Sequence, residues 1–242
     1  MSESSEALRQ KLAIPRPQAI LFDVDGLLIE TGGAGTRSWR RAFADLYGIP
    51  ADIGEFTEAG MTDPVVGALT FRAVVGHDPS TEELARVVSR YLMRLPEEVA
   101  RSSGYRVLAG VEEQLLRLCR GGFLLGITTG ALETAAHSKL ARADLSRFFA
   151  FGGYGSDAAD RGELTRKAID RGGVISGSPL DPRRVLVVGD TPRDIVAAHA
   201  ANAVGVGVAS GKYSEEELLD AGAEYVLGSL EEDLPGTAQT VA

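Results

Sequence analysis

Short apolar runs alternate with amphipathic stretches along most of the chain. The apolar runs lie at 19–22, 123–128, 148–151, 185–188 and 204–208, with a weaker one at 225–227. Because they lack polar alternation, they are typical of strands buried on both faces. Helical spacing is found between them, at 111–120, 132–143, 164–171, 192–201 and 214–221. This alternation predicts an α/β fold, a Rossmann-like parallel sheet with helices on both faces.

The segment 32–104 interrupts the alternation, because it contains no convincing strand. Its apolar spacing predicts helices instead. The first covers 36–47 and places Trp39 in the core, and the second begins at Asp63, as an N-cap, followed by Pro64.

A third helix is predicted after Ser80, which forms the pattern of a capping box with Glu83, and Pro96 and Gly104 mark its end. We therefore expect a discontinuous α/β core (19–33 and 105–242), an inserted all-helical cap domain (34–104) and a flexible N-terminal tail (1–18). Glycine-rich joints flank the insertion and suit a hinge.

The overall composition favours a cytoplasmic protein. The N-terminus lacks the apolar stretch of a signal peptide, and no run approaches membrane-spanning length. Net charge is −9, so nucleic acids and anionic membranes are poor partners, and an anionic substrate needs a local cation or arginine. The single cysteine, Cys119, excludes an internal disulfide, and its helical spacing with Leu115 predicts a buried core position.

Acidic and hydroxyl side chains follow several of the predicted strands. Asp23 and Asp25 come after the first strand, Thr129 and Gly130 after the second, and Asp190 and Asp194 after the fourth. The carboxyl ends of parallel strands meet at one edge of a sheet, so these groups should converge. Clustered carboxylates repel one another unless a cation bridges them, and oxygen ligands favour Mg²⁺.

These motifs, in this order, resemble the haloacid dehalogenase superfamily, whose members are aspartate-nucleophile hydrolases. The resemblance extends from Ala19 to about Leu230. Within the superfamily, the chain is similar to a phosphoglycolate-phosphatase-like subgroup that has a helical cap after the first motif. It implies that Asp23 is the nucleophile and Asp25 the general acid and base. It also implies that Asp23, the Asp25 backbone carbonyl and Asp190 bind Mg²⁺, with Asp194 as an outer ligand.

The second and third motifs would bind the phosphoryl group. The resemblance assigns the second motif to Thr129 and Gly130, with Thr128 as the alternative to Thr129. Related sequences often have Asn after this glycine, whereas this chain has Ala131, which removes one potential polar contact. The third motif requires a lysine or arginine, for which Arg161 is the candidate and Lys167 the alternative.

The resemblance implies a phosphatase acting on a small phosphorylated metabolite, of the phosphoglycolate or sugar phosphate type, as a monomer or homodimer. Arg37 and Thr62 are the candidate substrate contacts from the cap. Asp25 and Asp190 argue against a dehalogenase, and the insertion has no lysine for phosphonate cleavage. Two alternatives remain, a phosphomutase of the same superfamily and a non-catalytic module that binds a phosphorylated ligand.

Overall fold

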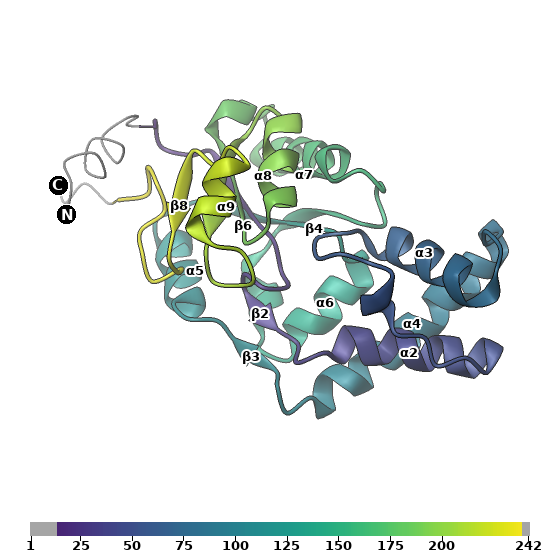
Figure 1. The fold of residues 1–242 in the computed structure, drawn as a ribbon. Coiled ribbons are helices and arrows are strands. Elements are labelled where there is room, and N and C mark those ends of the chain that lie inside the picture. The colour runs from purple at the N-terminus through teal and green to yellow at the C-terminus, as the bar shows by residue number, and fades with distance from the viewer. Residues whose placement is uncertain (1–13, 239–242) are drawn as a thin grey trace.

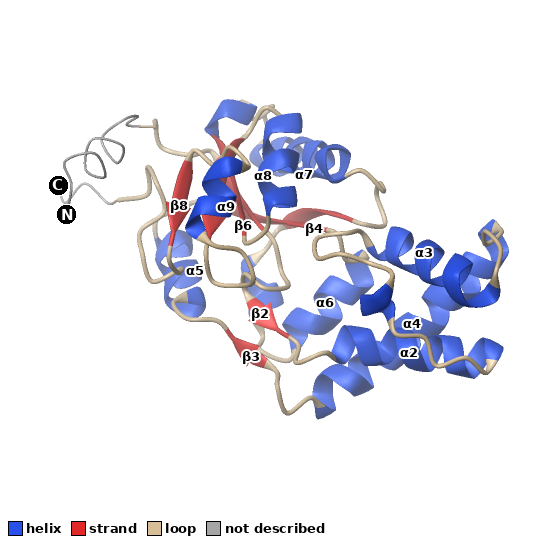
Figure 2. Ribbon diagram, viewed as in Figure 1, coloured by secondary structure: helices blue, strands red, loops and turns tan. Residues whose placement is uncertain are grey.

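The protein is built around a parallel sheet with helices on both sides (Figures 1 and 2). The structure, a computed structural model, describes residues 14–238. The sheet has six strands in the order β5-β4-β1-β6-β7-β8, and every neighbouring pair is parallel. Its strands are β1 (Ala19–Phe22), β4 (Leu124–Thr129), β5 (Phe151–Tyr154), β6 (Val185–Gly189), β7 (Val204–Val208) and β8 (Tyr225–Leu227). The α/β class predicted from the sequence is therefore confirmed.

Both faces of the central strand are buried, which explains why it is apolar throughout. Ile20 and Phe22 contribute to the larger core cluster, whereas Ala19 and Leu21 contribute to a second cluster. Side chains alternate between the faces of a strand, so a run without polar residues fills both layers. The larger cluster includes residues of α5 (Val111–Arg120) and α6 (Glu133–Ala141), and the second includes residues of α7 (Arg161–Ser176) and α8 (Pro192–Ala200).

The remaining helix of the core, α9 (Glu215–Asp220), packs beside β7 and β8. Short 3₁₀ helices are also present: η1 (Ile53–Glu55), η2 (Leu145–Phe148) and η3 (Pro182–Arg184). The positions of the core helices agree with the periodicity, although α7 extends further at both ends than the pattern 164–171 indicated.

A helical insertion follows β1 and lies to one side of the sheet in Figure 1. It comprises α2 (Ala34–Tyr47), α3 (Asp63–Val75) and α4 (Thr81–Arg101). Trp39 is buried as expected and stacks on Tyr91, with ring centroids 4.2 Å apart. A short antiparallel pair, β2 (Ile29–Glu30) and β3 (Arg106–Val107), joins the two ends of the insertion and was not anticipated from the sequence.

The ends of α3 and α4 can be compared with the capping residues predicted from the sequence. Ser80 and Glu83 form the predicted capping box of α4. Pro96 does not end that helix, which continues to Arg101. The N-cap of α3 is Thr62 rather than Asp63, which is the first helical residue, so the carboxylate of Asp63 is free to act elsewhere.

Two further sequence predictions are wrong. The third sheet strand is not 148–151 but β5, which includes Gly152, Gly153 and Tyr154. Gly153 must be small because an added Cβ would lie 1.9 Å from the Leu164 carbonyl oxygen. Cys119 is exposed rather than buried, because Val111, Leu115 and Leu118 form the inner face of α5 without it.

Residues 14–18 contact the core. Arg16 lies over the ring of Phe123, and the Gln18 N–H group donates to the Arg184 carbonyl. The predicted flexible tail concerns mostly residues 1–13, which lie outside the described part of the chain. No helix within residues 14–238 is both long and apolar enough to cross a membrane. The cytoplasmic location, the oligomeric state and the domain boundaries remain predictions.

Candidate active site

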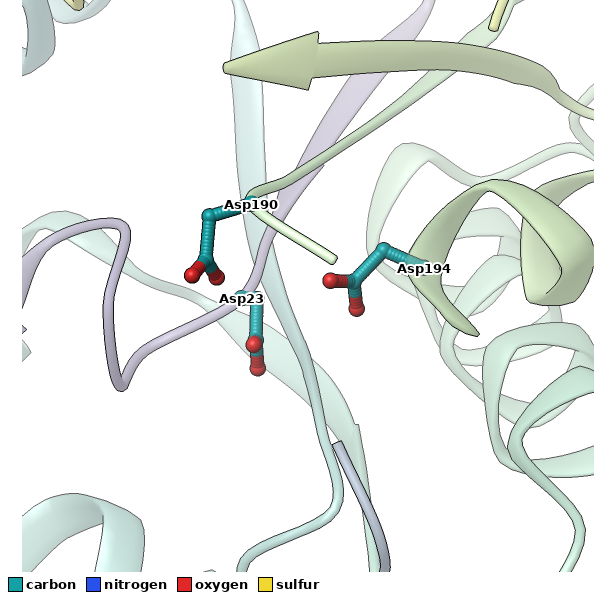
Figure 3. Close-up of side chains that lie close together, drawn as sticks. All are labelled: Asp23, Asp190 and Asp194. Carbon is teal, nitrogen blue, oxygen red and sulfur yellow. The ribbon is translucent and has the colours of Figure 1, made fainter. Parts of the chain in front are cut away.

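Three carboxylates converge at the carboxyl edge of the sheet. Asp23 follows β1, Asp190 follows β6, and Asp194 lies in the first turn of α8. One oxygen atom of each lies within 4.8 Å of the others, and Figure 3 shows the three side chains close together. The Asp23 N–H group donates a hydrogen bond to the Val188 carbonyl of β6 at 2.9 Å, which holds Asp23 beside that strand. The predicted convergence of Asp23, Asp190 and Asp194 is therefore present.

The turn after Asp23 depends on Gly26. This residue has a φ of +86°, a conformation that side chains with a Cβ disfavour. A Cβ at Gly26 would also lie 2.3 Å from Asp190 Oδ2. The Gly26 N–H group donates to the Ile29 carbonyl at 2.9 Å, which closes the loop and leaves Asp25 at its bend. The loop thereby returns the chain so that Asp25 lines the same cavity as Asp23.

Asp194 is held by partners on both of its oxygen atoms. Oδ2 accepts hydrogen bonds from the Thr191 N–H group at 3.0 Å and from the Thr191 hydroxyl at 2.7 Å, as the capping box of α8. Oδ1 accepts a hydrogen bond from Arg161. Arg161 is the first residue of α7, and its guanidinium also lies 3.6 Å from Asp23. Arg161 therefore lies between the candidate nucleophile and Asp194.

The site has the properties of a cation-binding site. Asp23 Oδ1 and Asp190 Oδ1 are buried and have no hydrogen-bond partner in the described structure. Burial, followed by the charge of Asp194, raises the pKa of Asp23 to about 7. Burial and the charge of Asp23 raise the pKa of Asp190 to about 8. A divalent cation beside these two oxygen atoms would offset both effects, and carboxylate ligands suit Mg²⁺, so the residues fit this ion.

The loop of the second motif contacts the insertion. Thr129 is buried at the end of β4, and its Oγ1 accepts a hydrogen bond from the Ala131 N–H group. The Asp63 N–H group donates to the Gly130 carbonyl at 2.8 Å, and the Leu132 N–H group donates to Asp63 Oδ2 at 2.9 Å. Since α6 has no side-chain cap of its own, Asp63 supplies the carboxylate at its N-terminus from the insertion.

A cavity of about 520 Å³ lies over this edge of the sheet. Both the core and the insertion contribute to its walls. The lining residues with charged or hydroxyl side chains are Asp23, Asp25, Glu30, Asp63, Arg106, Thr129, Lys139, Arg161, Asp190, Thr191, Ser210 and Lys212. Its size suits a small metabolite, and its charge pattern suits an anion that binds together with a cation.

The family model for haloacid dehalogenase-like hydrolases matches residues 17–202, which include β1, the insertion and the chain as far as β6 and α8. The chain belongs to this family. A phosphoglycolate phosphatase from Agrobacterium fabrum (strain C58) is 25% identical to this hydrolase over 217 residues, covering 88% of this chain and 89% of the relative.

Solved structures show the same fold. A predicted phosphatase from Clostridium acetobutylicum is similar to this hydrolase with a TM-score of 0.69 at 20% identity, covering 89% of this chain and 95% of the other. A putative β-phosphoglucomutase from Bacteroides vulgatus has a TM-score of 0.66 at 20% identity, covering 93% and 88% of the two chains. These likenesses support the architecture described above.

Other candidate residues of this hydrolase lie outside the cavity. Arg37 is bound by Glu98 at 2.9 Å and by the Gly32 carbonyl at 2.7 Å, so it ties α2 to α4. Thr62 is buried and lines a neighbouring cavity of about 400 Å³, whereas Met61 and Asp63 line the acidic one. Lys167 donates to the Asp157 carbonyl at 2.6 Å, and Arg161, unlike Lys167, is placed beside Asp23.

Thr128 is also excluded as the lining hydroxyl. Its Oγ1 lies 2.9 Å from Thr165 Oγ1 of α7, and Thr129 lines the cavity instead. Alternation along β4 gives the two threonines opposite directions.

Lys139 is a residue of the site that sequence reasoning missed. Its side chain is 7% exposed, and its Nζ lies 2.5 Å from Asp25 Oδ2. Burial alone lowers the pKa of Lys139, but the charges of Asp25 and Asp63 outweigh this effect and place the pKa above its ordinary value. The available signal was its position in α6, where it shares the buried face with Ala135, Ala136 and Leu140.

The raised pKa values of Asp23 and Asp190 predict a pH-dependent stability. In the unfolded chain both carboxyls titrate near pH 4. The metal-free folded protein therefore binds more protons than the unfolded chain above that pH, and its free energy of unfolding falls as the pH rises through about 7 and 8. We expect a lower melting temperature at pH 8.5 than at pH 6 in a chelating buffer.

Magnesium should reverse this effect, because it binds the charged carboxylates of the folded state. Thermal melts at both pH values, with EDTA or with 10 mM Mg²⁺ (roughly a saturating concentration), measure the difference. An equal melting temperature at both pH values in EDTA would contradict the assignment of a destabilised acidic pair.

Proposed function

We propose that this protein is a Mg²⁺-dependent phosphatase that hydrolyses a small phosphomonoester of the phosphoglycolate or sugar phosphate type. The observation that carries the proposal is the placement of Asp23, with an unpartnered oxygen atom, in one cavity with Arg161 and Asp25. The family membership supports a hydrolase, and the name of the Agrobacterium fabrum relative supports phosphoglycolate as the first substrate to test.

In the proposed reaction, the Asp23 carboxylate attacks phosphorus, and the bond between phosphorus and the leaving oxygen breaks. The protonated carboxyl of Asp25 gives its proton to that oxygen, so the product leaves as an alcohol. Asp25, now a carboxylate, then takes a proton from a water molecule that attacks the aspartyl phosphate. This second step releases inorganic phosphate and restores both Asp23 and the protonated Asp25.

The remaining residues bind and orient the phosphoryl group. Arg161 places its guanidinium beside Asp23, and its Nε is buried without a partner in the described structure, so a donor remains for a phosphoryl oxygen. Thr129 and the N–H groups of the loop at Gly130 provide neutral donors at the start of α6. Asp23, Asp190 and the Asp25 backbone carbonyl would hold Mg²⁺, which supplies charge neutralisation when bound, with Asp194 fixing Arg161 beside them.

The helical insertion would act as a cap. Its residues Gly60, Met61 and Asp63 line the cavity together with the sheet edge. Close contact is possible because Gly130 has no side chain: a Cβ there would lie 2.6 Å from the Met61 carbonyl oxygen. A cap in this position would exclude water from the phosphoryl group and contact the leaving group.

Phosphate release from a panel of small phosphomonoesters, with Mg²⁺ or with EDTA, tests the proposal. We expect Mg²⁺-dependent release from at least one alkyl phosphate and none in EDTA. Loss of turnover in Asp25→Asn with retained ligand affinity would be expected of the enzyme, whereas a binding module would show no release even in the wild type. A phosphomutase would instead convert one sugar phosphate to an isomer without net phosphate release, which chromatography of the products detects.

A further inference from the structure

Lys139 and Asp25 form an ion pair in the lining of the cavity, in which the lysine is buried and the aspartate is partly exposed. The Lys139 side chain is 7% exposed, whereas that of Asp25 is 42% exposed. Among the three lysines of the described residues, Lys139 is the buried one; Lys167 is part-exposed and Lys212 is exposed. A charged ammonium away from water is costly, so its position requires a compensating interaction.

The Asp25 carboxylate has few other constraints. Its backbone lies at the bend of the loop after β1, where a single isolated bridge pairs it with Ile29. Within residues 14–238, the hydrogen bond from Lys139 Nζ to Asp25 Oδ2 is the contact that holds this carboxyl group. Removal of the ammonium would therefore free the side chain to rotate into the cavity, where more than a third of its surface is already accessible.

The backbone of Lys139 is held in place by its neighbours. It lies in α6 on the face that packs into the core, beside Ala135 and Leu140. The Tyr105 hydroxyl donates to the Lys139 carbonyl at 2.8 Å, and the start of α6 is fixed by the hydrogen bond from Leu132 to Asp63. The helix that carries the ammonium is thus held by Tyr105 and, through Asp63, by the insertion.

Arg161 and Lys139, whose side chains are largely buried, pair with different acidic residues of the cavity. Arg161 lies against Asp23 and Asp194, and Lys139 lies against Asp25. Arg161 therefore has the position to bind a phosphoryl group at the nucleophile. Lys139 lies instead at the residue that, in the proposed function, transfers the proton.

We infer that Lys139 is a positioning residue that holds the Asp25 carboxyl group in the orientation required for proton transfer to the leaving oxygen. The inference rests on the proposed phosphatase reaction. A general acid must lie within hydrogen-bond reach of the atom that it protonates, and misplacement by about 1 Å lowers the rate on the order of 100-fold. Lys139 acts through Asp25 and has no contact with the reacting atoms in this account.

Leaving-group dependence separates this role from a structural one. An alkyl alcohol leaves only when it is protonated, whereas 4-nitrophenolate leaves without a proton. The parameter kcat/KM covers steps up to release of the alcohol or phenol, so it excludes the later hydrolysis of the aspartyl phosphate. Loss of Asp25 positioning must therefore lower kcat/KM for an alkyl phosphate far more than for 4-nitrophenyl phosphate.

The experiment compares Lys139→Met, Lys139→Arg and the control Arg183→Met in the full chain with Mg²⁺; Arg183 is an exposed cation that pairs with Asp181 outside the cavity. The substrates are 4-nitrophenyl phosphate and the alkyl phosphate that the wild type hydrolyses fastest. For Lys139→Met we expect kcat/KM to fall about 100-fold with the alkyl ester and less than about threefold with the aryl ester. Lys139→Arg, which keeps a cation, should show a smaller difference between the two esters in the same direction, and Arg183→Met should resemble the wild type.

The outcomes are distinguishable. Equal losses with both esters, or no loss with either, would overturn the inference while the wild-type activity upholds the proposed function. A rise in KM for the alkyl ester alone, with kcat unchanged, would overturn it in favour of substrate binding by Lys139. If Lys139→Met does not fold, the inference is tested by whether Lys139→Arg loses more kcat/KM with the alkyl ester than with the aryl ester. Absence of phosphate release by the wild type from both esters would refute the proposed function and the inference together. In an Asp25→Asn background, Lys139→Met should cause no further loss.

Discussion

Replacement of Asp23 by asparagine is expected to abolish phosphate release and, at the same time, to stabilise the metal-free protein. Activity should fall about 10⁴-fold or more, because an amide is not a nucleophile toward phosphorus. In EDTA at pH 8 the melting temperature should rise by roughly 5 °C, because a buried carboxyl with its pKa raised to about 7 no longer has to ionise next to Asp190 and Asp194.

Asp220→Asn is the matched control, since Asp220 is an exposed residue at the end of α9 and does not line the cavity. It should change neither the activity nor the melting temperature. With saturating Mg²⁺ the stability gain of Asp23→Asn should shrink or reverse, because the variant loses a metal ligand. Retention of phosphate release by Asp23→Asn would rule out Asp23 as the nucleophile.

Replacement of Arg161 by methionine should have the second largest effect. The variant loses the cation beside Asp23 and leaves the buried Asp194 without its charged partner. We expect kcat/KM to fall about 10³-fold and the free energy of unfolding to fall by about 3 kcal/mol. Steady-state kinetics and urea denaturation in Mg²⁺ measure the two effects.

Arg161→Lys and Lys167→Met serve as comparisons. The lysine variant keeps a charge but loses the planar geometry that contacts two carboxylates, so it should recover stability more than activity. Lys167→Met should leave both quantities near wild type, because Lys167 contacts a backbone carbonyl and the exposed Glu163. A larger loss of activity in Lys167→Met than in Arg161→Met would assign the third motif to Lys167 instead.

The sheet was predictable because its strands are buried on both faces. Runs such as 185–188 and 204–208 contain no polar residue, and their short length favours buried strands over helices. The bounds of β5 were predicted wrongly because glycines such as Gly152 and Gly153 are more typical of loops than of strands. Their small size is required by tight packing against Tyr154 and Leu164, a tertiary constraint that local propensity does not contain.

The acidic half of the site was predictable for a different reason. Asp23, Asp190 and Asp194 each follow a recognisable strand, and parallel topology brings the carboxyl ends of strands together. Lys139 and Asp63 follow no strand. They reach the cavity from the last turn of α6 and the start of α3, so their place depends on how helices pack, which the spacing of apolar residues alone does not determine.

The position of β1 at the centre of the sheet determines when the site is completed during synthesis. Asp23 emerges from the ribosome early, but the strands that flank β1 begin only at Leu124 and Val185. The packing of α2 against α4 needs no later sequence, so the insertion is able to form first. A chain that ends before Val185 lacks both β6 and Asp190, so Asp23 becomes buried and acquires its acidic neighbours only near the end of translation.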